Sequence, residues 1–219
     1  MCGTIGTVTQ DAGKRAAAEA AALLAAPGMR VGLGTGSTVA FLLPVLARRS
    51  LDCVYVATSP RTELAARQLG LDVRAFDELD HLDLAIDGAD QVAPDRWLVK
   101  GGGGAHTREK VVAAAAERFV VIVSPDKLVD RIEAPIALEL LRFGLAATIA
   151  ALGDVRVREV PPSPDGGVIA DWWGEIGSPA DLCGMLANQP GVVEHGLFPA
   201  ELVTEVIVGH QGGATTKIF

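Results

Sequence analysis

Short apolar runs alternate with helix-forming stretches from the start of the chain to about residue 130. The runs are continuously apolar, which is typical of strands buried on both faces. This alternation predicts a parallel sheet covered by helices on both sides. The expected strands are 29–33, 53–57, 71–74, 82–86, 97–99 and 119–123, and the expected helices are 9–26, 37–49, 61–69 and 105–118. The first helix is rich in alanine, with Thr9 as its expected N-cap and Pro27-Gly28 as its end.

The pattern changes after about residue 130. Turn signals appear at Pro161–Pro164 and at Asp165-Gly-Gly167. The surrounding pattern indicates an α+β arrangement with antiparallel hairpins and a second, smaller domain. Its expected strands are 155–160, 168–172, 192–194 and 202–208, and its expected helices are 139–152 and 178–187.

Composition excludes several classes of protein. The chain has 219 residues, 49% of them hydrophobic, so it can bury a substantial core in one large domain or two modest ones. The net charge of −8 argues against a surface for nucleic acid or anionic membrane, because both need a basic field. A local phosphate site built from backbone N–H groups remains possible.

Cysteine use and the N-terminal sequence bear on the compartment. Cys2, Cys53 and Cys183 are too few and too scattered for a disulfide framework or a zinc cluster, so we expect a reducing cytoplasm. The N-terminus lacks a basic region followed by an apolar core, so no signal peptide is expected. The alanine-rich stretch 16–26 is too short and too weakly apolar to span a bilayer.

The glycine- and hydroxyl-rich stretch Gly32-Leu-Gly-Thr-Gly-Ser-Thr38 lies between a predicted strand and a predicted helix. It does not fit a dinucleotide fingerprint, because Ser37 stands where the third glycine belongs and Asp52 precedes the second strand rather than ending it. It does not fit a P-loop, because no lysine precedes the hydroxyl residue. The hydroxyls and the converging N–H groups suit a single phosphomonoester at a helix N-terminus. A tight turn with a helix cap is an equally good interpretation of this stretch alone.

Acidic and basic residues gather around a second glycine-rich segment. Asp87 and Asp90 follow one apolar run, Lys100 ends another and is followed by Gly101–Gly104, and Glu109 lies at the start of the next helix. Four consecutive glycines are costly in backbone entropy, so such a loop indicates close approach of a ligand to the backbone. Acids, a lysine and bare backbone suit proton transfer next to a carbonyl. The structural alternatives are an aspartate turn, a flexible loop with a solvated lysine, and a surface glutamate beside Lys110.

A metal site is also conceivable. His106 and Glu109 have i, i+3 spacing, and the two aspartates could lie near them. Only one histidine is available in this segment, and carboxylate clusters serve proton transfer equally well.

The placement of these segments strengthens the functional interpretation. The 32–38 stretch, the two aspartates, the lysine–glycine loop and Ser124-Pro-Asp-Lys127 each follow a predicted strand directly. In a parallel sheet these strand ends share one edge, where ligands bind.

In this order and spacing, four motifs resemble those of type A ribose-5-phosphate isomerases. They are Gly32-Leu-Gly-Thr-Gly-Ser-Thr38, Asp87-Gly-Ala-Asp90, Lys100-Gly-Gly-Gly103 and Thr107-Arg-Glu-Lys110. The stretch Pro190–Phe198 is similar to the family's C-terminal signature. The resemblance covers nearly the whole chain. The chain departs from the family pattern in four places. Gln91 stands where glutamate is usual, and His106 where an apolar residue is common. The stretch Glu133–Leu140 matches the usual proline-rich strand only loosely, and the residues before Thr9 have no counterpart.

The resemblance implies the roles of individual residues. Glu109 would be the proton acceptor, and Asp87 and Lys100 would be catalytic with it. The substrate would be bound by Thr35, Gly36, Ser37, Thr38, Asp87, Gly88, Ala89, Asp90, Lys100, Gly101, Gly102, Gly103 and Lys127.

The resemblance also implies the fold and the activity. We expect an α/β protein with a Rossmann-like parallel-sheet domain, 1–131 and 208–219, and a smaller ferredoxin-like α+β domain, 132–207, inserted near the C-terminus. The implied reaction interconverts D-ribose 5-phosphate and D-ribulose 5-phosphate through an enediolate, in the non-oxidative branch of the pentose phosphate pathway. The implied enzyme uses neither cofactor nor metal, binds neither nucleic acid nor membrane, and forms a homodimer or homotetramer.

Two rival functions are compatible with parts of the same pattern. A sugar-phosphate deaminase or CoA transferase could use a related fold, and ammonia release or CoA dependence would identify it. A non-catalytic sugar-phosphate sensor of a transcription regulator would need a DNA-binding segment, which the residues before Thr9 are too few to form. The acidic charge and the presence of both Glu109 and Lys100 also favour catalysis.

Overall fold

The structure, a computed structural model, describes residues 4–218. The chain divides into two compact units, which are described one at a time. The first unit comprises 1–89, 111–127 and 202–219, and the second comprises 90–110 and 128–201. No helix within residues 4–218 is long and apolar enough to cross a membrane.

The first unit is built on a seven-stranded sheet in the order β14-β13-β7-β4-β1-β2-β3. All neighbouring strands are parallel except β13 and β14, which form an antiparallel hairpin at one edge. The strands are β1 (Arg30–Leu33), β2 (Val54–Ala57), β3 (Asp72–Val73), β4 (Leu84–Asp87), β7 (Phe119–Val123), β13 (Glu205–His210) and β14 (Gly213–Ile218). All five residues of β7 are buried, as its uninterrupted apolar sequence predicts for a central strand.

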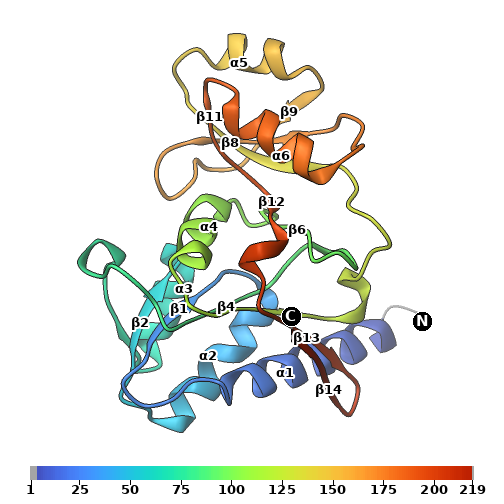
Figure 1. The fold of residues 1–219 in the computed structure, drawn as a ribbon. Coiled ribbons are helices and arrows are strands. Elements are labelled where there is room, and N and C mark those ends of the chain that lie inside the picture. Colours follow the sequence, from blue (N-terminus) through green and yellow to red (C-terminus); the bar gives the residue numbers. More distant parts are fainter. Residues whose placement is uncertain (1–3, 219) are drawn as a thin grey trace. The chain divides into compact units, whose positions relative to one another are not determined.

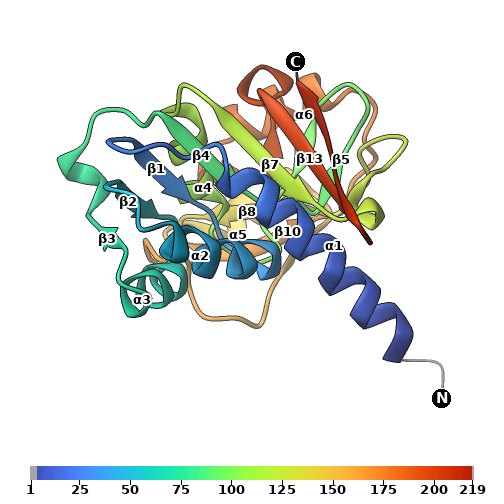
Figure 2. The ribbon, with the colours of Figure 1, turned by 90° about the horizontal axis from the view of Figure 1, so that it is seen from below.

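Helices α1 (Thr4–Ala22), α2 (Ser37–Arg49) and α3 (Pro60–Gln68) belong to the same unit. Figure 2 shows α1 and α2 side by side along one face of the sheet, and α1 packs against α2, β7 and β13. The alanines of α1 favour a helix, and those at 17, 18 and 21 are fully buried. Their small side chains allow close packing. In α2, apolar residues at 39, 42, 43 and 46 form the buried face.

The second unit contains a four-stranded antiparallel sheet in the order β11-β8-β10-β9. Its elements follow one another as β8 (Ile136–Leu140), α5 (Leu145–Leu152), β9 (Val155–Val157), β10 (Val168–Trp172), α6 (Pro179–Asn188) and β11 (Val192–His195), and all but β10 are labelled in Figure 1. This β-α-β-β-α-β order is the ferredoxin-like arrangement. A separate three-stranded sheet joins β12 (Leu197–Phe198), β6 (Leu98–Val99) and β5 (Gln91–Val92). The expected fold class is therefore confirmed.

Three expected helices differ from the observed ones by more than one residue at an end. The first begins at Thr4 rather than Thr9 and ends at Ala22. The helix that carries Glu109, α4 (His106–Ala114), ends before Arg118, because Leu82 pairs with the backbone at Ala115 and Glu117. The expected helix 139–152 is wrong in its first part, since 136–140 form β8 and α5 begins only at Leu145. All five β8 residues are buried, and burial in the sheet outweighs the helix propensity of Leu and Glu.

Some strands were not expected from the sequence, or were expected elsewhere. The strands β5, β12 and β14 were not anticipated, and β9 ends at Val157 instead of residue 160. The last parallel strand, β13, begins at Glu205, while Leu202 lies in the 3-10 helix Ala200–Leu202. The compact units differ in bounds from the domains 1–131 with 208–219 and 132–207, because 90–110 belongs to the second unit. As a division into domains, those bounds stay a prediction.

Candidate active site

In the first unit, the loop between β1 and α2 combines exposed backbone with a helix start. Gly36 precedes α2 with φ of 129°, and no side chain caps the helix. The first N–H groups of a helix have no partner within the helix, so those of Ser37 and Thr38 suit an anionic ligand. The sequence prediction of a strand, a bare loop and a helix at 32–38 is confirmed.

A network of hydroxyl groups that follow β2 holds the loop between β1 and α2 in place. The Thr35 hydroxyl lies 2.9 Å from that of Thr58 and 2.8 Å from that of Ser59. Ser59 bonds to Thr62, whose hydroxyl donates to the Gly34 carbonyl at 3.0 Å. Thr58, Ser59 and Thr62 were not expected as partners of this loop, although Ser59-Pro60 after a strand is a recognisable helix start.

Asp87, the last residue of β4, is buried with 3% of its surface exposed. Its Oδ1 accepts the N–H groups of Thr35 at 3.0 Å and of Gly88 at 2.7 Å. These charge-assisted hydrogen bonds hold a carboxylate in one orientation at the strand end. A Cβ on Gly34 would overlap the Asp87 carboxyl group, so only glycine allows this approach.

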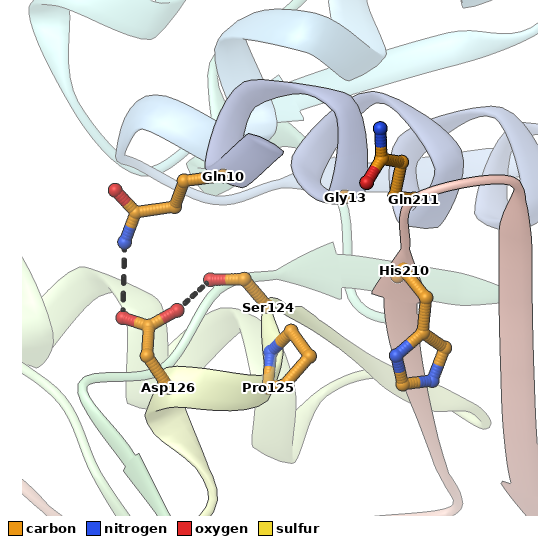
Figure 3. A pocket seen from close by; sticks show the side chains of 8 residues that line it. Gln10, Gly13, Ser124, Pro125, Asp126, His210 and Gln211 are labelled. Carbon is orange, nitrogen blue, oxygen red and sulfur yellow. Dashed lines mark hydrogen bonds between the residues drawn. The ribbon is translucent and has the colours of Figure 1, made fainter. Parts of the chain in front are cut away.

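The end of β7 carries the predicted substrate ligand Lys127, within the 3-10 helix Pro125–Lys127. Figure 3 shows the neighbouring Asp126 accepting hydrogen bonds from Gln10 at 3.1 Å and Ser124 at 2.5 Å. Burial favours the neutral acid, but these hydrogen bonds and the Lys127 charge hold the pKa of Asp126 below its usual value. A cavity of about 550 Å³ lies beside these residues.

In the second unit, Lys100 and Glu109 form a buried ion pair. Lys100 Nζ lies 3.0 Å from Glu109 Oε2, and the side chains are 3% and 5% exposed. Lys100 Nζ also lies 5.5 Å from the centre of the Phe198 ring, and Lys110 Nζ lies 5.1 Å from it. Phe198 thus contacts two cations, a role that sequence reasoning did not assign.

Every neighbour of Glu109 in the Thr107–Lys110 motif is tied to another element of the second unit. Thr107 donates to the buried Glu139 at 2.5 Å, and Arg108 forms two bonds with Asp165 at 2.7 and 2.8 Å. Lys110 Nζ bonds to Glu194 at 2.6 Å and to the His195 carbonyl at 2.7 Å. Burial lowers the pKa of Lys110. The first turn of α4 is therefore held on both sides of the proposed base.

The glycine loop contacts Asp90 directly. Gly102 N–H donates to Asp90 Oδ2 at 2.8 Å, and the Asp90 N–H donates to the Val99 carbonyl at 2.7 Å. Asp90 is exposed, in contrast to Asp87.

The structure corrects one expectation about placement. Lys100 follows β6, and β6 pairs antiparallel with β5 and β12 rather than joining the parallel sheet. The residues 34–38, 88–90 and 124–127 do follow the parallel strands β1, β4 and β7. The lysine–glycine loop therefore does not share that edge by sheet topology. The strands β5 and β6 have two residues each and form a local hairpin, which apolar content alone could not distinguish from a parallel strand.

The structure explains one of the departures from the family pattern, Gln91, and leaves His106 without a structural explanation. Gln91 forms a pair of hydrogen bonds with the Glu133 backbone, donating to its carbonyl at 2.7 Å and accepting its N–H at 2.8 Å. A glutamate could not donate in this way. The His106 ring is fully buried, and neither nitrogen has a hydrogen-bond partner. Burial and, secondarily, the Lys110 charge lower the pKa of His106 to about 4.

Within residues 4–218, no group of three or more His, Cys, Asp or Glu side chains is arranged to hold a metal ion. The four residues that the sequence offers as metal ligands make other contacts or are buried. Asp87 binds backbone N–H groups, Asp90 binds Gly102, Glu109 pairs with Lys100, and His106 is buried.

Comparison with known proteins gives the same family at the level of sequence and fold. Residues 54–213 match the family model of ribose 5-phosphate isomerase A (phosphoriboisomerase A). The chain is 41% identical to ribose-5-phosphate isomerase A of Nitrobacter hamburgensis, over 94% of this chain and 97% of that protein. It is 39% identical to the protein of that name from Methanosarcina acetivorans, over 95% and 94%.

Solved structures agree with this. The crystal structure of ribose 5-phosphate isomerase A from Neisseria gonorrhoeae superposes with a TM-score of 0.91 at 31% identity, covering 96% of this chain and 97% of that one. A D-ribose-5-phosphate isomerase in complex with phospho-erythronic acid superposes with a TM-score of 0.90 at 32% identity, covering 96% and 99%. These matches extend over nearly the whole length, and the chain belongs to the ribose 5-phosphate isomerase A family.

Proposed function

We propose that this protein interconverts D-ribose 5-phosphate and D-ribulose 5-phosphate through an enediolate, as an aldose–ketose isomerase of the non-oxidative pentose phosphate pathway. Membership of the family supports the substrate and the class of reaction. The observation that supports the chemistry most directly is the buried Lys100–Glu109 pair, because it combines a carboxylate base with a cation.

Glu109 is the base that transfers the proton. Its carboxylate removes the proton from C2 of the open-chain aldose and returns it to C1. The hydroxyl proton on O2 moves to O1 as the carbonyl shifts from C1 to C2, so no net proton is gained or lost. A positioned base of this kind contributes about 10²–10⁴ in rate. Lys100 and the N–H groups of Gly101 and Gly103 stabilise the negative charge that develops on the substrate oxygens, while the Gly102 N–H holds Asp90, and one such donor is worth about 10²–10³.

Asp87 assists the opening of the furanose ring. Opening removes a proton from the C1 hydroxyl and adds one to the ring oxygen, so a single carboxyl group can accept the first and return it. The two backbone N–H bonds to Oδ1 keep the Asp87 carboxyl in place while the proton moves.

The remaining residues bind the substrate. Thr35–Thr38 and Lys127 bind the phosphate group, and the helix start at Ser37 supports this role. Gly88 and Ala89 contribute backbone contacts, and Asp90 orients the sugar hydroxyls.

We further propose that the protein is a cytoplasmic homodimer or homotetramer that works without cofactor or metal. The family resemblance supports the oligomer. The scarcity of cysteine supports a reducing compartment.

A single assay tests the function. Purified protein is incubated with ribose 5-phosphate in the presence of a chelator, and formation of the ketose is followed by NMR. We expect conversion to an equilibrium mixture, at the same rate with the chelator as without it. Absence of ketose would contradict the proposal, and activity that returns only with one added divalent ion would contradict metal independence. Ammonia release from an amino-sugar phosphate, or a requirement for CoA, would favour the rival activities.

A further inference from the structure

Arg158 follows β9 in the second unit and belongs to none of the motifs singled out in the sequence. Its Nε and Nη2 donate to the two carboxylate oxygens of Asp171 at 2.8 and 2.6 Å. The two side chains are 21% and 17% exposed. A bidentate pair of this kind fixes the plane of the guanidinium, and so it fixes the direction of the third nitrogen, Nη1.

That third nitrogen reaches the glycine loop. Arg158 Nη1 donates to the Gly101 carbonyl at 2.7 Å and lies 3.4 Å from the Gly102 carbonyl. The Gly101 carbonyl also accepts the Gly104 N–H at 3.1 Å, which closes the loop on itself. The backbone of the loop is therefore attached to the ferredoxin-like sheet through one arginine.

The opposite side of the same peptide is bound by Asp90. The C=O of Gly101 and the N–H of Gly102 belong to one planar peptide, and a trans peptide directs them to opposite sides. The C=O is bound by Arg158, and the N–H donates to Asp90 Oδ2 at 2.8 Å. The orientation of this peptide thus determines where the Asp90 carboxylate is held.

The glycine loop cannot be made rigid by larger residues. Gly101 has φ of 111°, and a Cβ there would collide with Ala137 and lie 2.9 Å from the His106 ring. Consecutive glycines carry a high conformational entropy, so their order has to come from outside contacts. Arg158 supplies such a contact.

We infer that Arg158 is a positioning residue for the isomerase reaction, which acts through the Gly101–Gly102 peptide on the Asp90 carboxylate and on the backbone donors of the loop. This inference rests on the proposed function, because it assigns the loop and Asp90 to the substrate. Arg158 itself touches neither substrate nor reacting atoms in this scheme.

Steady-state kinetics of Arg158→Met test the inference. Displacement of reacting groups by about 1 Å can cost about 10²-fold in rate, so we expect kcat to fall by about 10- to 100-fold. KM for ribose 5-phosphate should change by less than about three-fold, because the phosphate contacts remain. Arg158→Lys, which keeps the charge but lacks the planar fork, should lose less. Methylguanidinium should restore part of the activity of Arg158→Ala and have no effect on the wild type.

Arg156→Gln is the matched control. Arg156 lies on β9 two residues away, is 64% exposed, and pairs with Asp154 at 3.5 Å. An exposed pair of this kind contributes little, so its removal should leave kcat unchanged.

A double-mutant cycle separates positioning from general destabilisation. If Arg158 acts through the peptide bound to Asp90, the kcat losses of Arg158→Met and Asp90→Asn should be non-additive. In kcat/KM, the losses of Arg158→Met and Thr38→Val should multiply, because Thr38 belongs to the other unit and is assigned to phosphate binding. If Arg158 had a purely structural role, its combination with Asp90→Asn and its combination with Thr38→Val would show the same degree of additivity.

The outcomes are distinguishable from failure of the proposed function. A wild-type protein that does not convert ribose 5-phosphate refutes the function itself. An active wild type with a folded Arg158→Met variant of equal kcat refutes the role of Arg158. If Arg158→Met does not fold, Arg158→Lys decides, since an unchanged kcat in that variant together with no rescue of Arg158→Ala also refutes it.

Discussion

Glu109 and Lys100 are almost fully buried, so each charge depends on the other for its stability. Removing one partner of a buried ion pair typically costs about 3–5 kcal/mol, because the remaining charge loses its compensation. Substitutions at these two residues therefore have to be judged by substrate binding and stability as well as by rate.

Glu109→Gln should nearly abolish isomerisation while ribose 5-phosphate still binds. The amide keeps the shape of the side chain and an oxygen that can accept from Lys100, but it cannot take the C2 proton. We expect kcat to fall by at least about 10²-fold and the melting temperature to drop by several degrees. The measurements are turnover, calorimetric binding of ribose 5-phosphate and thermal unfolding.

Glu117→Gln is the control for this substitution, since Glu117 is an exposed glutamate just beyond the end of α4. Turnover of Glu109→Gln within a few-fold of the wild type would exclude Glu109 as the base.

At the level of elements, the turn after β1 packs directly against the end of β4. Gly34→Ala would place a Cβ onto the Asp87 carboxyl group, so Asp87 must move and lose its bonds to Thr35 and Gly88. We expect at least about a 10²-fold loss in kcat, comparable to a displacement of about 1 Å in an active site. Steady-state kinetics measure this loss.

Gly28→Ala separates steric overlap from backbone strain. Gly28 has φ of 85° but nothing within 4 Å of an added Cβ. The Gly28→Ala substitution should lower the free energy of unfolding by only about 1–2 kcal/mol and leave kcat unchanged. Equal losses of activity in the two variants would mean that Asp87 is not held as described.

Thr38→Val should weaken binding of ribose 5-phosphate more than binding of unphosphorylated ribose. Thr38 lies in the first turn of α2, where N–H groups lack partners within the helix, whereas Thr35 is bound to Thr58 and Ser59. Calorimetric titration of both sugars measures the difference. An equal loss for the two sugars would mean that the loop has a structural role alone.

The elements predicted best from the sequence are those with a strong local pattern. The helix 37–49 and the strand 119–123 have the predicted bounds, because a regular apolar face and an uninterrupted apolar run each define one structure. The expected helix 139–152 includes the last two residues of β8, Glu139 and Leu140, which favour a helix locally, and pairing with the neighbouring strands β10 and β11 makes them part of a strand. The edge strand β14 contains Thr and Lys and follows from pairing with β13 rather than from its own pattern.

The sequence motifs name candidate residues, and the structure shows further residues that contact them, to which the sequence assigned no such role. Phe198 lies close to 100 positions from Lys100 in the sequence, and Arg158 more than 50 from Gly101, so no local spacing links them. The fold of the second unit brings them together. Buried contacts between distant segments are therefore what the sequence alone could not supply.

At the level of the whole molecule, two buried histidines make stability depend on pH. His106 and His195 are 0% and 2% exposed, and burial lowers their pKa values to about 4 and about 3. In the unfolded chain histidine titrates near 6.5. Above that pH neither state is protonated, so the full stability is present. As the pH falls from about 6.5 towards 4, the unfolded chain binds protons that the folded protein excludes, and stability is lost.

The free energy of unfolding should therefore fall between pH 7 and pH 5 by about 2 kcal/mol for each of these histidines. The carboxylates Asp126 and Asp165, whose pKa values are lowered, contribute mainly at lower pH, because their stabilisation is lost only below the unfolded value near 4. Urea unfolding at the two pH values measures the difference.

His106→Leu should remove about half of this pH dependence and keep most of the isomerase activity. The ring makes no hydrogen bond, so leucine removes two buried polar atoms without partners, and the variant should be at least as stable as the wild type at pH 7. His210→Gln is the control, because His210 is exposed and its loss should leave the slope unchanged. If His106→Leu retains the full pH dependence of the free energy of unfolding, His106 binds a proton in the folded protein as readily as in the unfolded chain. That result would contradict the conclusion that the buried ring stays neutral. If its activity is lost and one divalent ion restores activity in the wild type after chelation, His106 belongs to a metal site.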